Sequence, residues 1–527
     1  MPDDVLLMPH IVRPNTFAPQ NFVSSYPARK RVPRPGILAL ISLIALAPLP
    51  LLLLAQSPVP LNTRFIGWGL WIMCLFPSWQ YFREKRNRIP IPFMPAIGLL
   101  FLIYYARPLV FGSYNEHWRI RLDPTQDYDY AAQLAFEGWL MLLIGWQLTR
   151  PRRGRPTVAV SDYQKMRKVA LIFACLAPIS QVVSNMTVWP PVIAGITRFV
   201  ATLGYFGIGL LTMIRASRQP DLAAKVVLFC TAGALMALQL SAGSISPFLM
   251  TSALLFLSVW AVRGRLSPML VVGALFVGVT SYVIKGTLDD YRKVTWFTTD
   301  QFTSRQRISV LSNLASDQIQ NRGVLGAILT GRRATSKRSA NMDLMADVVR
   351  RTPGEIPYWR GYTYGSLIGV AIPRALWPSK PLKALGQDFG HRYSYILPRD
   401  MQTAINLPYM VEFYANFGEI GVIIGMLIVG VIYGVLARFI NRPGQTAFIT
   451  VTGIVLYLPL LNVESDFSLT FGGLLMNGFA LWLLLRVTRS GTRSAKSVIS
   501  SGASRPQIVY PAPAPGAAGY ATPYRSG

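Results

Sequence analysis

Residues 361–421 gather basic, acidic and aromatic side chains within a chain that is otherwise strongly apolar. Arg374 and Lys380 stand beside Trp377 in a stretch rich in proline, and Glu412 leads into an apolar run. A guanidinium group binds phosphate oxygens as a planar fork, and an ammonium group adds a point charge. The segment is therefore the first place to look for a site that binds an anion.

The composition of the chain indicates where this segment must lie. Of the 527 residues, 52% are hydrophobic and 14% are charged, and the mean hydropathy is +0.36. This is too apolar for an ordinary soluble protein of the same size. Apolar stretches of about 20 residues recur, which is the length that an α-helix needs to cross a bilayer. The ~10-residue alternation of a membrane β-barrel is not seen in the sequence. We expect an all-α, polytopic helical membrane protein.

Twelve apolar stretches are predicted to be transmembrane helices. They cover residues 36–56, 65–82, 93–112, 130–149, 167–187, 191–214, 224–242, 246–262, 267–286, 418–440, 446–462 and 467–487. Lys and Arg concentrate in every second connection, as the positive-inside rule requires of cytoplasmic loops. We therefore expect a multi-pass protein with both termini in the cytoplasm.

This topology divides the chain into five parts. They are a cytoplasmic N-terminal arm (1–35), nine transmembrane helices (36–286), a large extracytoplasmic loop (287–417), three further transmembrane helices (418–487) and a cytoplasmic tail (488–527). The tail is rich in Ser, Ala, Pro and Gly and is expected to be disordered. The loop is strongly basic, which long loops tolerate on the outer side, and it is expected to contain short amphipathic or re-entrant helices.

Fixed positive charges at the depth of the lipid headgroups suit an anionic ligand that is anchored in the membrane. A polyprenyl diphosphate has these properties, and the headgroups of ordinary lipids are an equal alternative. Arg198 lies within the predicted span 191–214, and ionisable residues inside a membrane are functional candidates by default. The basic run from Arg332 to Arg338, in contrast, is typical of a solvated surface.

Two motifs resemble the oligosaccharide repeat-unit polymerases, the O-antigen polymerase family of bacterial envelopes, which is related in fold to the O-antigen ligases. The first motif is IPRALWPSKP at residues 372–381, and the second is EFYANFGEIG at residues 412–421. Members of that family carry an IPR-x-x-W-P-x-KP element in a large periplasmic loop, and NFG preceded by a carboxylate at the start of the next span. The spacing of Arg350 and Gly361 matches an Arg-x10-Gly pattern of some members. The rest of the chain matches in architecture alone.

The resemblance implies a membrane glycosyltransferase of the bacterial inner membrane. Such an enzyme polymerises lipid-linked oligosaccharide repeat units into O-antigen, capsule or exopolysaccharide. A glycan on polyprenyl diphosphate is then the donor, and a lipid-linked repeat unit supplies the acceptor hydroxyl. A flippase and a chain-length regulator are the implied protein partners, membrane lipids surround the chain, and no cofactor or metal is expected.

The candidate site residues follow from these roles. Diphosphate binding is expected of Arg374, Lys380 and Arg360, with Arg198 and Arg350 as weaker candidates. The general base is expected to be Glu412, with Asp388 and His391 as alternatives. Stacking on sugar rings is expected of Trp377, Tyr362 and Tyr414, although anchoring at the membrane interface explains each of them equally well.

Other classes of protein fit the sequence less well. The three Cys and three His residues have no zinc spacing. The net charge of +29 lies largely at helix ends, so nucleic-acid binding is not expected. The alternatives are an O-antigen ligase, another glycosyltransferase that uses polyprenyl-linked sugars, and a flippase or exporter of lipid-linked glycans. A flippase needs polar residues through both leaflets, whereas the polar residues of this chain gather toward the outer side.

Overall fold

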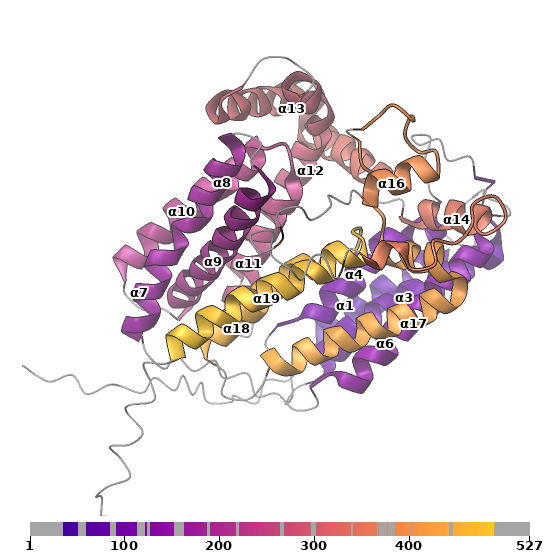
Figure 1. Ribbon diagram of the computed structural model, residues 1–527, viewed down its shortest axis with the longest axis horizontal. Coiled ribbons are helices and arrows are strands. Elements are labelled where there is room, and N and C mark those ends of the chain that lie inside the picture. Colours follow the sequence, from indigo (N-terminus) through magenta and orange to yellow (C-terminus); the bar gives the residue numbers. More distant parts are fainter. Residues whose placement is uncertain are drawn as a thin grey trace, which may run out of the picture. The chain divides into compact units, whose positions relative to one another are not determined.

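The computed structural model describes residues 35–50, 59–84, 91–112, 122–123, 127–151, 163–186, 190–217, 221–263, 268–296, 302–338, 341–365, 367, 377, 385–401, 403–441 and 446–489. The chain divides into two compact units, Met1–Leu481 and Trp482–Gly527. Of the second unit, the structure describes the last residues of one helix. Among the described residues there is no strand, and the expectation of an all-α protein is confirmed (Figure 1).

The described part of the chain is built from a succession of helices. They are α1 (Pro35–Leu46), α3 (Leu61–Arg83), α4 (Phe93–Phe101), a π-helical turn η1 (Leu102–Ala106), α5 (Arg107–Phe111), α6 (Asp129–Thr149), α7 (Tyr163–Ala174), α8 (Leu176–Met186), α9 (Pro191–Ala216), α10 (Leu222–Ser241), α11 (Ile245–Arg263), α12 (Pro268–Trp296), α13 (Ser304–Arg338), α14 (Asn341–Arg351), a 3₁₀ turn η2 (Tyr362–Tyr364), α16 (Leu385–Arg392), α17 (Tyr409–Ile440), α18 (Ala447–Leu460) and α19 (Phe467–Arg489).

Eight helical stretches of the described chain are long and apolar enough to cross a membrane. They are Phe93–Phe111, Tyr163–Asn185, Ile193–Ala216, Leu222–Ser241, Ile245–Arg263, Leu270–Leu288, Tyr409–Ile440 and Phe467–Leu484. Two shorter apolar helices cover Gly36–Pro50 and Ala447–Leu460, and α3 and α6 occupy the two remaining predicted ranges. The chain is therefore built from helices suited to a membrane.

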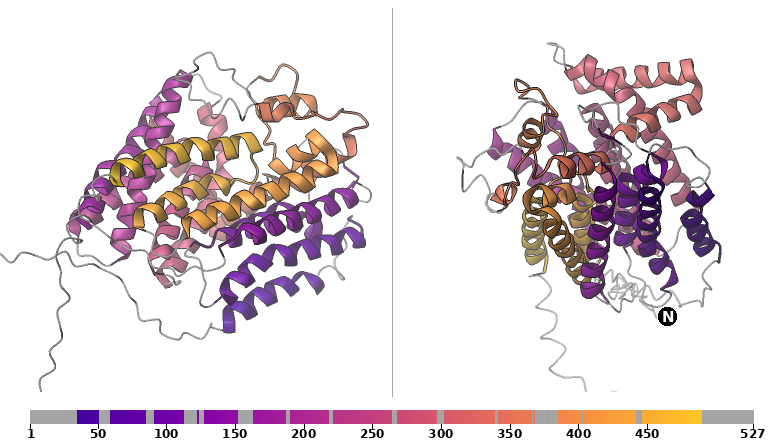
Figure 2. Two further views of the ribbon diagram at one scale, coloured as in Figure 1. Left: turned by 60° about the horizontal axis from the view of Figure 1, so that its bottom comes forward. Right: turned by 90° about the vertical axis from the view of Figure 1, so that its right-hand side faces the viewer.

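Helices α6 and α17 run side by side and parallel (Figures 1 and 2). In the first turn of α6, and just after Gly418 in α17, the Tyr130 hydroxyl donates to Glu419 Oε2 (2.9 Å), and farther along the Thr149 hydroxyl donates to Val431 O (3.2 Å). Glycines allow the two backbones to touch, since a Cβ at Gly145 would lie 2.3 Å from a carbonyl oxygen of α17. Small residues at helix contacts are the usual way to bring membrane helices close.

A second group of helices packs around α9, which contacts α7, α8, α10, α11 and α18. Gly204 and Gly207 lie directly against the backbone of Ala177 and Ala174, so α9 meets α7 and α8 without intervening side chains. Asp221 caps α10 by accepting from Ala224 N (2.9 Å), and it also accepts from Tyr163 (2.7 Å). This carboxylate therefore joins the start of α7 to the start of α10.

The region predicted as an extracytoplasmic loop is more helical than expected. Helix α12 continues to Trp296, beyond its predicted end at residue 286, and α13 spans 35 residues with a break at Gly323. Helix α17 begins at Tyr409 rather than at residue 418. At Gly418 its backbone turns to φ 67° and ψ −149°, so the helix is interrupted at the residue where the span was predicted to start.

Candidate functional site

The first two turns of α17, residues 409–417, form the base of the candidate site. Pro408 precedes the helix, and Gly418 interrupts it with a left-handed φ that favours glycine. Glu412 and Asn416 are four residues apart, and residues at this spacing share one face of a helix. Both side chains are buried, and both bind segments from elsewhere in the chain.

Glu412 is fully buried and connects α17 to the start of α19. Its Oε2 accepts a hydrogen bond from the backbone N–H of Phe467 at 2.6 Å. Its Oε1 has no partner at hydrogen-bonding geometry among the described residues, although the Thr363 side chain also interacts with the carboxyl group. Glu412 therefore holds backbone in place, and it is not open to solvent.

Asn416 fixes the segment that contains η2. Its amide Nδ2 donates to the Thr363 hydroxyl at 2.9 Å, and its Oδ1 accepts from the backbone N–H of Gly361 at 2.9 Å. The backbone N–H of Arg360 donates to Asn416 O at 3.2 Å. Ser468, at the start of α19, donates to Thr363 O at 3.1 Å. Residues 360–363 are thus clamped between α17 and α19.

The clamped segment makes a tight turn that brings two side chains to the surface. Arg360 and Gly361 have φ angles of 50° and 88°, and left-handed conformations of this kind favour glycine. A Cβ at Gly361 would lie 3.4 Å from the Phe417 ring. On either side of Gly361, the Arg360 and Tyr362 side chains are exposed. The turn therefore presents a cation and an aromatic ring together.

Asp388, on α16, lies beside this ring. The Tyr362 hydroxyl donates to Asp388 Oδ2 at 3.4 Å, and 53% of Tyr362 is exposed. The charge of Asp388, together with partial burial, raises the pKa of Tyr362 above its ordinary value. Behind Tyr362, Trp359 packs edge to face at 6.1 Å. An aromatic face and a carboxylate therefore share one surface, and the exposed Arg360 lies two residues before Tyr362 in the same turn.

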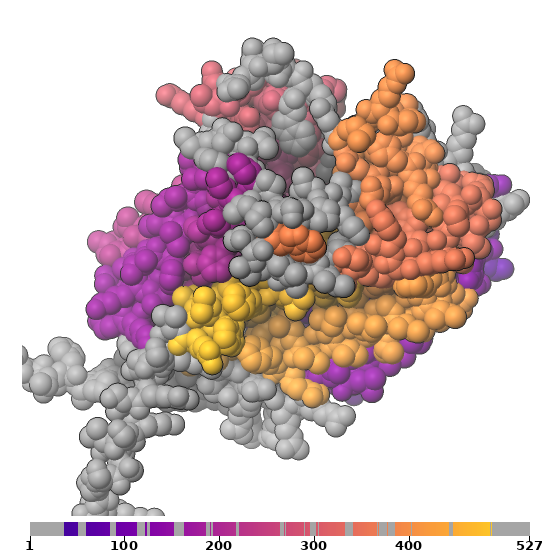
Figure 3. Space-filling view, in the orientation of Figure 1, coloured from indigo at the N-terminus to yellow at the C-terminus, as the bar shows by residue number. Residues whose placement is uncertain are grey.

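Trp359 and Arg392 position α16 against the clamped segment. Trp359 meets Phe389 of α16 at 6.4 Å between ring centroids. The Arg392 guanidinium lies 5.4 Å from the Trp359 ring and donates to Pro357 O at 2.6 Å. The space-filling view in Figure 3 shows α16 and the segment after α14 next to each other on one face. These contacts give Asp388 a defined place beside Tyr362.

An ion network centred on the buried Asp347 supports the same region from α14. Asp347 accepts from Arg350 at 2.6 Å and from the Tyr395 hydroxyl at 2.7 Å. Arg350 also lies 3.9 Å from Asp127 and 3.8 Å from Glu355. Because three carboxylates surround Arg350, its positive charge is already balanced by the protein. The geometry does not favour the prediction that Arg350 binds a diphosphate.

The other predicted residues are spread more widely. Arg374 and Lys380 lie outside the described residues, and Trp377 is described and exposed. Tyr414 is buried and donates to Thr352 O at 3.3 Å, so it offers no open face to a sugar. His391 Nε2 is buried without a hydrogen-bond partner among the described residues. Arg198 is exposed on α9, a helix that none of the site contacts above involve.

The site also contains residues that the sequence analysis did not single out. Thr363, Trp359, Arg392 and Asp347 all contribute contacts described above. Only Asp347 carries a local signal, because Arg350 and Arg351 follow it at the i+3 and i+4 positions of a strongly amphipathic helix. Thr363 bonds to Asn416, which lies 53 residues farther along the chain, and the Trp359 ring packs against Phe389 on a separate helix. No local sequence pattern reveals either contact.

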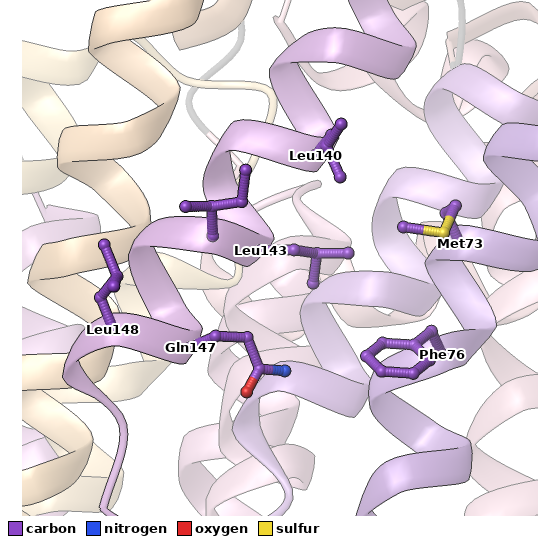
Figure 4. Close-up of a pocket in the computed structure, with 7 residues that line it drawn as sticks. Met73, Phe76, Leu140, Leu143, Gln147 and Leu148 are labelled. Carbon is purple, nitrogen blue, oxygen red and sulfur yellow. The ribbon is translucent and has the colours of Figure 1, made fainter.

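No metal cluster occurs at this site in the described part of the chain. No group of three His, Cys, Asp or Glu side chains among these residues is arranged to hold a metal ion. A cavity of about 340 Å³ lies between α3 and α6, lined by Met73, Phe76, Leu140, Leu143, Ile144, Gln147 and Leu148 (Figure 4). Its α6 residues begin about 15 Å along the helix from Tyr130. The cavity is apolar apart from Gln147.

Comparison with curated proteins and with solved structures gives no match. A family model described as "Domain of unknown function (DUF8712)" matches residues 153–450, which is more than half of the chain and includes α14, α16 and all of α17. The chain therefore belongs to the DUF8712 family.

Proposed function

We propose that the protein is a membrane glycosyltransferase that polymerises lipid-linked oligosaccharide repeat units on the outer face of a bacterial inner membrane. In this proposal twelve helices cross the membrane, both termini are cytoplasmic, and residues 287–417 face the periplasm. The observation that carries the proposal is the contact of the exposed Tyr362 with Asp388, with the exposed Arg360 in the same turn as Tyr362. Together these residues provide a cation, an exposed ring and a carboxylate next to the start of an apolar helix long enough to span a membrane.

Each of the three side chains suits one part of the reaction. The Tyr362 ring offers a flat face to a sugar, Arg360 suits the diphosphate of a lipid carrier, and Asp388 suits a hydroxyl group that must lose a proton. The motif residues Arg374 and Lys380 lie outside the described residues and are assigned by the resemblance alone. Glu412 was the first choice for the base, but its burial and its bond to Phe467 N favour a positioning role instead.

In the proposed reaction, the acceptor hydroxyl attacks the anomeric carbon of the donor glycan. The new C–O bond forms as the bond from that carbon to the diphosphate oxygen breaks. Asp388 takes the proton of the hydroxyl, and the polyprenyl diphosphate leaves with the bonding electron pair. Arg360 stabilises the negative charge that develops on the leaving group. Holding both lipid-linked substrates in place supplies much of the remaining rate enhancement.

The test is Asp388→Asn in the source organism, with the chromosomal copy deleted. We expect chain extension to fall by roughly 10²–10⁴-fold, because a general base typically contributes that factor. Single repeat units should accumulate on the lipid carrier, and gel analysis of the glycan together with mass spectrometry of the lipid fraction measures both effects. The matched control is Tyr362→Phe, which removes the hydroxyl next to Asp388 but keeps the ring, and it should retain most of the activity.

The side of the membrane on which the intermediate accumulates separates this proposal from a transporter. A polymerase variant leaves single repeat units on the periplasmic side, where an impermeant glycosidase or periodate reaches them. A failed flippase or exporter leaves them on the cytoplasmic side. Normal long-chain glycan in Asp388→Asn cells would show that Asp388 is not the general base. Accumulation of single repeat units on the cytoplasmic side would overturn the assignment as a polymerase.

A further inference from the structure

The second part of α13, residues 324–338, exposes apolar side chains although it lies outside the predicted transmembrane spans. Val324, Leu325 and Leu329 are 54%, 70% and 43% exposed, whereas Ala327 is fully buried. At 100° per residue the three exposed side chains share one face of the helix, and Ala327 lies on the opposite face. The break at Gly323, where φ is +68°, separates this part from the rest of α13.

Contacts with α12 join this part of α13 to the end of a stretch that is suited to cross a membrane. A Cβ at Gly331 would lie 1.7 Å from Tyr282 O, so the two backbones touch at that point. Gly286 in turn lies against Gln318 and Gly331. Tyr282 and Gly286 belong to the last two turns of Leu270–Leu288, a stretch suited to cross the membrane. The exposed apolar face is therefore close to the level at which that span ends.

The sequence of the same part is strongly basic. Between residues 318 and 338 there are five basic residues and no Asp or Glu, namely Arg322, Arg332, Arg333, Lys337 and Arg338. An apolar face next to a group of basic residues is typical of helices that lie in the plane of a membrane surface. Each basic residue near a surface of anionic lipid increases binding by about fivefold.

We propose that residues 324–338 form an interfacial helix that binds the surface of a bilayer containing anionic phospholipid. Val324, Leu325 and Leu329 enter the boundary between headgroups and acyl chains, and the basic residues that follow bind the headgroup phosphates. Because Gly331 of α13 touches Tyr282 of α12, binding to the bilayer surface holds α13 against the outer end of α12. The inference depends on the membrane location of α12 and is independent of the proposed glycosyltransferase activity.

The test uses the full chain with Cys74, Cys175 and Cys230 replaced by alanine and one new cysteine, Leu325→Cys, labelled with the fluorophore NBD. The protein is reconstituted in nanodiscs of phosphatidylcholine alone or with 30% phosphatidylglycerol. We expect a blue-shifted emission that doxyl-labelled acyl chains quench, and a larger shift with phosphatidylglycerol. The matched control is Ser312→Cys, on the exposed surface of the first part of α13, whose label should stay in water and be quenched by iodide.

A charge variant separates binding of anionic lipid from simple apolar contact. In Leu325→Cys protein that also carries Arg332→Gln, Arg333→Gln, Lys337→Gln and Arg338→Gln, the effect of phosphatidylglycerol should disappear. A monodisperse profile in size-exclusion chromatography and an unchanged Ser312→Cys signal show that the variant is folded. The proposal is overturned if iodide quenches the label at residue 325 as strongly as at residue 312. It is also overturned if phosphatidylglycerol has the same effect with and without the four basic residues.

Discussion

At the scale of single residues, burial separates the side chains that are candidates for the general base. From the sequence, Glu412 is the first choice, with Asp388 and His391 as alternatives. Their difference lies in burial, which depends on residues far away in the sequence. Glu412 is enclosed by η2 and the start of α19, whereas Asp388 reaches the surface beside Tyr362.

Glu412 should tolerate glutamine but not alanine. A glutamine oxygen can still accept from Phe467 N, so Glu412→Gln should keep the fold and most of the activity. Glu412→Ala leaves this buried N–H without a partner, which costs about 1–3 kcal/mol in the free energy of unfolding. Thermal unfolding of the detergent-solubilised protein measures the difference. If Glu412→Gln is stable but inactive, Glu412 itself takes part in the chemistry and Asp388 does not act as the base.

The dependence of burial on distant residues also explains how much of the site could be predicted from the sequence. The motif that contains Asn416 and the Arg-x10-Gly spacing that ends at Gly361 stand out in the sequence, and in the structure one hydrogen bond joins Asn416 to Gly361. Trp359 and Arg392, however, act through ring packing between segments that meet only after folding. No spacing along the chain predicts such a contact, so these two residues could not be assigned to the site from the sequence alone.

At the scale of helices, periodicity and hydropathy located the apolar segments well because each membrane helix must satisfy its own backbone. Helix ends were less accurate where polar residues continue a helix beyond the apolar run. The start of α17 shows this, since residues 409–417 are helical yet separated from the apolar part by Gly418. Hydropathy responds to the apolar part and therefore placed the start at residue 418.

The contact between α6 and α17 should not tolerate an added methyl group. In Gly145→Ala the new Cβ would meet Leu427 O, a backbone atom that can move only with its helix. We expect a loss of about 1–3 kcal/mol in stability, typical of overpacking. The control is Gly233→Ala on α10, where nothing lies within 4 Å of the added Cβ. Equal thermal stability of the two variants would show that α6 and α17 are not in backbone contact.

The link between α7 and α10 predicts a dependence of stability on pH. Partial burial alone would raise the pKa of Asp221, but hydrogen bonds from Arg167, Ala224 N and Tyr163 lower it to about 2, from an ordinary value of 3.8. A lowered pKa means that the carboxylate stabilises the fold above about pH 4 and loses this effect as the pH falls toward 2. Solvent screening limits the contribution to about 1 kcal/mol.

Comparison of the wild type with Asp221→Asn isolates this contribution. The wild type should have the higher melting temperature at pH 6, and the difference should shrink as the pH is lowered from 4 to 2.5. Differential scanning fluorimetry in detergent measures it across that range. A difference in melting temperature that stays constant with pH would mean that the charge of Asp221 is not what joins the two helices.

At the scale of the whole molecule, the alternation of basic and neutral connections predicts a specific topology. In a chain whose three cysteines are replaced by alanine, Leu397→Cys should react with an impermeant maleimide in intact cells, because its exposed side chain belongs to the proposed periplasmic region. Ser217→Cys, in a predicted cytoplasmic connection, should react only after lysis. Labelling in the reverse order would place the candidate site in the cytosol and contradict the proposed function.

The pairing of α6 with α17 has a consequence for biosynthesis. Thr149 and Val431 touch although 282 residues separate them. During translation, α6 emerges long before α17 has been synthesised. Until then, the glycines of α6 that contact α17 must face lipid or another protein. The enclosure around Glu412 and Thr363 closes later still, once the ribosome has released Phe467 and Ser468. The helix pair and the enclosure around Glu412 should therefore be complete only when synthesis is nearly finished.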